Sequence, residues 1–83
     1  MPYDKEYVIR LSGLDLGQVI DGLEARATAW RLTAQYLETG DAPEGFVVEE
    51  CADVEEAHRM AEHYQRIIRS LIQQQGEQRD RGT

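Results

Sequence analysis

The spacing of apolar and polar residues changes from a period of two to a helical period, and this change repeats once along the chain. Residues 5–12 alternate, with Tyr7, Ile9 and Leu11 on one side and mostly polar side chains on the other. Strict alternation over this length is typical of a half-buried strand. We expect Gly13 to end the strand.

From residue 16 to residue 38 the apolar positions recur in steps of four and three, the spacing of a packed helical face. These positions are Leu16, Ile20, Leu23, Ala27, Trp30, Ala34 and Leu37. Asp15 is the expected N-cap, and Gly40 is the expected left-handed residue that ends the helix.

The same two patterns then repeat. Residues 45–51 begin with Phe46, Val47 and Val48 and predict a second short strand. Asp53 and Glu56 have the spacing of a capping box, so a second helix is expected to begin one residue after Asp53. Its apolar positions are Val54, Ala57, Met60, Ala61, Tyr64, Ile67, Ile68, Leu71 and Ile72. We expect it to end at residue 75, before Gly76.

The order strand, helix, strand, helix predicts one small α+β domain over residues 1–75, followed by a flexible polar tail over residues 76–83. Strands joined through a helix would pair in parallel by a right-handed crossover. Because two isolated strands are marginally stable in water, we expect a second protomer to complete a shared sheet or a helical bundle.

The first helix carries a second apolar ridge on the side opposite its packed face. The ridge consists of Gly22, Ala25, Ala29, Leu32 and Tyr36. Small residues allow another helix to approach closely, so we interpret the ridge as a homodimer or partner interface. The alternative is that it rests on the protein's own second helix or is ordinary surface.

Charge is the feature that indicates a kind of partner. The net charge is -7, and half of the 16 acidic residues lie between Glu38 and Glu56, where there is no Lys or Arg. Such a focused negative field attracts a basic protein surface and disfavours direct nucleic-acid binding. The expected partner-binding acids are Glu38, Asp41, Glu44, Glu49 and Glu50.

A local explanation of the acidic run stays open. Asp53, Glu55 and Glu56 would occupy the first turn of the second helix, where the macrodipole favours negative charge. Glu49 would pair with Arg10 across the strands, and the remaining acids would only keep a structural homodimer soluble.

In charge and size alone, the chain is similar to small inhibitors that mimic DNA, among them some anti-CRISPR proteins. That likeness implies inhibition of a nucleic-acid-binding protein. The sequence contains no motif that supports it further.

The sequence predicts no enzyme and no cofactor. Glu55 and His58 have the Glu-x-x-His spacing of di-iron helical bundles, and Glu62 follows one turn later. These side chains lie away from the apolar stripe, so we interpret them as a solvated face and keep a metal site as an alternative. The single cysteine, Cys51, is typical of a reducing compartment. The polar first residues and the lack of a long apolar run predict a cytoplasmic protein with no signal peptide or membrane span.

Overall fold

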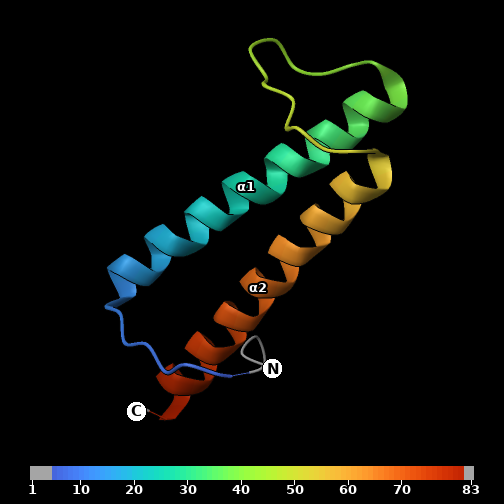
Figure 1. The fold of residues 1–83 in the computed structure, drawn as a ribbon. Coiled ribbons are helices and arrows are strands. Elements are labelled where there is room, and N and C mark those ends of the chain that lie inside the picture. The colour runs from blue at the N-terminus through green and yellow to red at the C-terminus, as the bar shows by residue number, and fades with distance from the viewer. Residues whose placement is uncertain (1–4, 82–83) are drawn as a thin grey trace.

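Two long antiparallel helices make up the fold (Figure 1). The computed structural model describes residues 5–81, so predictions for residues 1–4 and for the last two residues of the expected tail lie outside the described part. Helix α1 spans Gly13–Thr39 and helix α2 spans Val54–Arg81. Within residues 5–81, neither helix has an apolar stretch that could cross a bilayer.

The predicted α+β fold is wrong, because residues 5–81 form a helical hairpin that contains no strand. Residues 5–12 and 45–51 form neither helix nor strand: the first segment precedes the N-terminus of α1, whereas the second runs back along α1, where Glu49 bonds to Thr33 and Arg26 (Figure 1). A strand exists only when its backbone pairs with a neighbouring strand. Instead, α2 packs against α1, and Glu49 of the second segment bonds to Thr33 and Arg26 of α1, so the two segments do not meet and the parallel crossover does not form.

Capping sets the bounds of α1. The helix begins at Gly13 rather than Leu16, because the Ser12 hydroxyl accepts a hydrogen bond of 3.1 Å from the Asp15 N–H. Ser12 is therefore the N-cap, and Asp15 lies in the first turn. The predicted C-terminal stop is confirmed: Gly40 has a φ of 80°, and its N–H donates to the Tyr36 carbonyl at 2.7 Å.

Helix α2 begins at the predicted residue, Val54, but continues through Gly76 to Arg81. Gly76 has no positive φ. A glycine inside a helix costs only about 1 kcal/mol relative to alanine, so Gly76 does not end a helix whose neighbouring residues favour it.

The two predicted apolar faces meet in the middle of the hairpin. The buried apolar side chains are Ala27, Trp30 and Ala34 of α1 and Ala57, Ala61 and Ile68 of α2. Leu37 and Ile72, at the ends of the predicted stripes, are exposed. The contact between the helices is therefore narrow and is made mostly of alanine.

Candidate functional site

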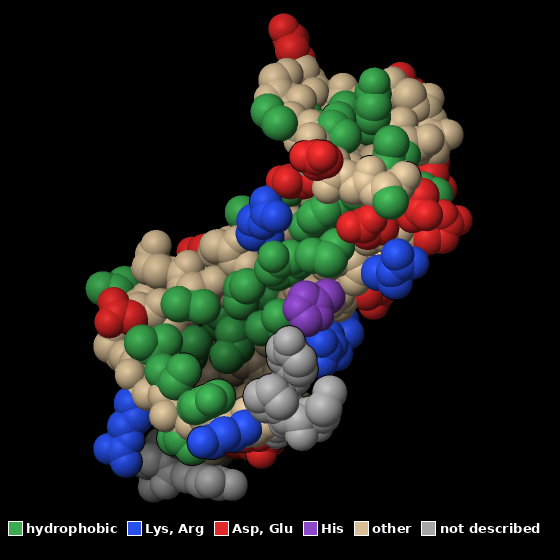
Figure 2. Space-filling model, in the orientation of Figure 1, with side chains coloured by type: hydrophobic (Ala, Val, Ile, Leu, Met, Phe, Trp, Pro, Cys, Tyr) green, Lys and Arg blue, Asp and Glu red, His purple; other side chains and the backbone are tan. Residues whose placement is uncertain are grey.

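The acidic run gathers at one end of the hairpin. We call this region the acidic end: Glu38 of α1, the loop of residues 40–53, and Glu55 and Glu56 of α2. The loop alone carries five carboxylates and no Lys or Arg, whereas α2 has five acidic residues balanced by five arginines. Figure 2 shows acidic side chains around the loop and the adjacent helix ends. Most of the net charge is therefore concentrated at one end of an elongated molecule.

Two of these acids cap α2, as the sequence predicts. The Glu56 N–H donates to Asp53 Oδ1, and the Ala52 N–H donates to Glu56 Oε2, both at 2.8 Å. The two side chains satisfy backbone donors that the first helical turn leaves free. Their role at this position is structural.

Glu49 also pairs with another residue of the same molecule. Its Oε1 accepts a hydrogen bond of 2.7 Å from Arg26 Nη1, so the predicted pair with Arg10 is wrong. The Arg26 guanidinium lies over two aromatic rings, 6.0 Å from the centroid of Trp30 and 5.9 Å from that of Tyr64. The nearby Tyr64 side chain, followed by the charge of Glu49, raises the pKa of Arg26. This cluster fastens the loop to both helices.

Thr33 provides a second attachment that sequence reasoning missed. It is 0% exposed, and its hydroxyl donates to the Ala29 carbonyl at 2.8 Å while it accepts the Glu49 N–H at 3.0 Å. A threonine inside a helix often bonds back to the carbonyl four residues earlier. The sequence carried no signal for the second bond, which depends on the path of the loop.

Glu38 joins the two helices. Its Oε1 lies 2.8 Å from His58 Nε2, and both side chains are exposed. The predicted acidic site therefore divides into two groups. Glu38 and Glu49 have internal partners, whereas Asp41, Glu44 and Glu50 are exposed and make no side-chain hydrogen bond or ion pair with other described residues.

The ridge on α1 is only partly buried. Gly22, Ala25 and Tyr36 are exposed, and Ala29 and Leu32 are partly buried.

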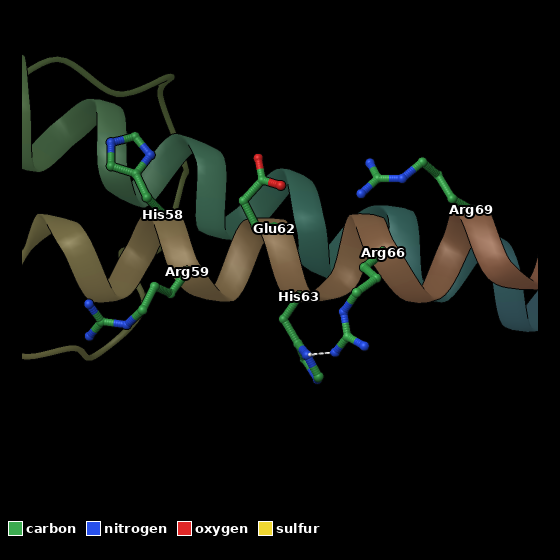
Figure 3. Close-up of a pocket in the computed structure, with 6 residues that line it drawn as sticks. All are labelled: His58, Arg59, Glu62, His63, Arg66 and Arg69. Carbon is green, nitrogen blue, oxygen red and sulfur yellow. Dashed lines mark hydrogen bonds between the residues drawn. The ribbon is translucent and has the colours of Figure 1, made fainter. Parts of the chain in front are cut away.

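Six side chains of α2 border an open depression of about 440 Å³: His58, Arg59, Glu62, His63, Arg66 and Arg69. Figure 3 shows that they point in two directions, with His58 and Glu62 on one side of α2 and Arg59, His63 and Arg66 on the other. Within the described residues, no group of three His, Cys, Asp or Glu is placed to hold a metal. The alternative metal site at Glu55, His58 and Glu62 thus receives no support.

Cys51 packs against the edge of the core near the start of α2. Burial, together with the nearby charges of Glu56 and Asp53, raises the pKa of its thiol. A thiol with a raised pKa carries little thiolate at neutral pH, so Cys51 is poorly suited to act as a nucleophile.

No protein-family model, curated protein or solved structure matches this chain.

Proposed function

We propose that this protein is a non-catalytic interaction module whose acidic end binds and modulates a basic surface on another protein. The observation that carries the proposal is the loop of residues 40–53, which holds five carboxylates and no basic residue. Arg26 compensates only Glu49, and the field of the other loop carboxylates steers a basic partner and strengthens the encounter at low salt. A partner whose basic surface binds nucleic acid is a sub-case of this proposal.

The attachment of the loop supports this function. The Glu49–Arg26 pair and the Glu49–Thr33 hydrogen bond fix the loop against α1. Exposed carboxylates on a fixed loop lose less conformational entropy on binding than the same groups on a free chain. The acids that we expect to contact the partner are Asp41, Glu44 and Glu50 on the loop and Glu55 at the start of α2.

The test compares two triple variants that change the net charge equally. One variant neutralises the acidic end with Asp41→Asn, Glu44→Gln and Glu55→Gln. The control neutralises exposed helical acids elsewhere: Asp21→Asn, Glu24→Gln and Glu77→Gln. Each tagged protein is used to capture partners from a lysate of its source cells at low and high salt, and quantitative mass spectrometry identifies what is retained.

A basic protein retained by the parent and by the control, released by salt and lost with the acidic-end variant would support the proposal. The same proteins captured by both triple variants would contradict it. Recovery of the bait alone would favour the structural homodimer whose charge only keeps it soluble.

A further inference from the structure

The acidic end also carries large apolar side chains that are exposed to solvent. Val47 of the loop is 79% exposed and Leu37 of α1 is 44% exposed, and Tyr36 and Val48 are exposed as well. We call these four residues the apolar patch. Exposed apolar side chains that are gathered together and rimmed by polar residues mark interaction sites.

A contact between the loop and α1 brings the two halves of the patch together. The Thr33 hydroxyl accepts the Glu49 N–H at 3.0 Å. Tyr36 and Leu37 follow Thr33 by three and four residues, so they lie one helical turn further along the same side of α1. Val48 directly precedes Glu49 in the chain. Figure 2 shows hydrophobic side chains gathered at this end of the hairpin, with acidic side chains around them.

The rim of the patch is acidic. Asp41 and Glu44 lie between the α1 part of the patch and the loop part, and Glu50 follows the loop part; all three are exposed. An apolar centre inside a polar rim is the usual anatomy of a protein–protein interface. A surface that only imitated the charges of nucleic-acid phosphates would have no need of the apolar centre.

The charge of the rim indicates what covers the patch. Two copies of the chain that met through their acidic ends would bring like charges together, which disfavours self-association through this surface. A neutral apolar partner would leave the carboxylates without compensation. The complementary occupant is a segment that carries basic and apolar side chains together.

We propose that the apolar patch and its acidic rim bind a basic amphipathic helix of the partner protein. Such a helix has an apolar stripe bordered by Lys and Arg, which matches an apolar centre bordered by carboxylates. The apolar stripe packs against Val47 and Leu37, and the basic side chains face Asp41, Glu44 and Glu50. This inference rests on the proposed function and narrows it to a partner with an apolar anchor.

The test measures the binding of two synthetic peptides to the purified full chain by calorimetry at low and high salt. Both peptides contain the same numbers of leucine and lysine. In one peptide the leucines recur at helical spacing, and in the other the order is scrambled so that no apolar face forms. We expect the helical peptide to bind about tenfold more tightly and to keep part of its affinity at high salt, where purely electrostatic binding is screened.

Val47→Ser tests the centre of the patch. It should weaken binding of the helical peptide about tenfold, because it removes a valine side chain that becomes buried in the complex. It should leave binding of the scrambled peptide unchanged. The control is Val8→Ser, which replaces another highly exposed valine that lies outside both helices and outside the acidic end. Circular dichroism checks that each variant is folded.

A second pair of variants tests the part of the patch on α1. Leu37→Gln should weaken binding of the helical peptide severalfold, whereas Leu14→Gln, at an exposed position near the other end of α1, should not. Glutamine favours a helix nearly as well as leucine, so both variants keep α1 intact.

The outcomes separate this inference from the proposed function. If the parent binds both peptides equally and Val47→Ser binds as tightly as the parent, the inference is overturned and a basic partner held by charge alone remains. If the parent binds neither peptide at low salt, both are overturned. If sedimentation shows that Val47→Ser dissociates a dimer of the parent, a second copy covers the patch and the inference is overturned.

Discussion

Replacing Thr33 with valine is the sharpest test of how the loop is attached to α1. The change preserves shape and β-branching but removes the hydroxyl, which donates to Ala29 and accepts the Glu49 N–H at 3.0 Å. The Ala29 carbonyl lies inside α1, where the helical backbone supplies donors. Losing the Thr33 hydroxyl therefore costs this carbonyl little. The Glu49 N–H loses its acceptor in a partly buried place.

The expected cost follows from that unsatisfied donor. A buried N–H without an acceptor destabilises a protein by about 1–3 kcal/mol, and partial burial places Thr33→Val at the lower end, near 1–2 kcal/mol. For a domain of this size, each kcal/mol lowers Tm by about 4–8 °C. We therefore expect Tm to fall by roughly 5–15 °C.

Thr39 provides a matched control on the same helix. Its hydroxyl donates to the Gln35 carbonyl at 2.8 Å and accepts the Asp41 N–H at 3.2 Å, so its bonds copy those of Thr33. Thr39 is exposed, however, and water can replace the lost hydroxyl. Thr39→Val should change the free energy of unfolding by no more than about 0.5 kcal/mol.

The assay is thermal and urea unfolding, followed by circular dichroism and by the fluorescence of the single tryptophan. Protein concentration is held constant, because association makes Tm depend on it. If Thr33→Val were as stable as Thr39→Val, the argument that a buried hydroxyl holds the loop would be wrong.

Three further predictions concern the core and the loop. Ala57→Leu should destabilise the hairpin by about 1–3 kcal/mol, because Ala57 is fully buried between the helices, whereas the exposed Ala42→Leu should leave urea unfolding almost unchanged. Arg26→Met should lower Tm and speed amide exchange in the loop, because it removes the ion pair with Glu49, and Arg31→Met should do neither. Because its pKa is raised, Cys51 should react with a thiol reagent at pH 8 more slowly than free cysteine, and its rate should increase at higher pH. A rate in the folded protein equal to that of free cysteine would contradict this.

Local patterns predicted the helices well. The three-and-four spacing on each helix placed Ala27, Trp30 and Ala57 in the core, and the bonds at Gly40 and Asp53 match the predicted caps. These features depend on residues within about one helical turn of each other, so they can be read from sequence.

The functional region was predicted only in part. The sequence located the acidic run, but it could not separate Glu49, which pairs with Arg26, from Asp41 and Glu44, which stay exposed. Arg26 and Glu49 are 23 residues apart in sequence. Their contact depends on the path of the loop rather than on any local spacing.

The sequence by itself determined the packed face in the middle of each helix, the C-cap at Gly40 and the N-cap at Asp53, because these depend on local sterics and side-chain periodicity. It misplaced the N-cap of α1, which is Ser12 rather than Asp15. The tertiary structure decided whether the two expected strands form, because a strand requires a partner at hydrogen-bonding distance. Within residues 5–81, α2 packs against α1 and Glu49 bonds to α1, so residues 5–12 and 45–51 do not meet and the chain folds as a helical hairpin. Residues of both segments that favour strands, such as Val8 and Val47, therefore stay exposed.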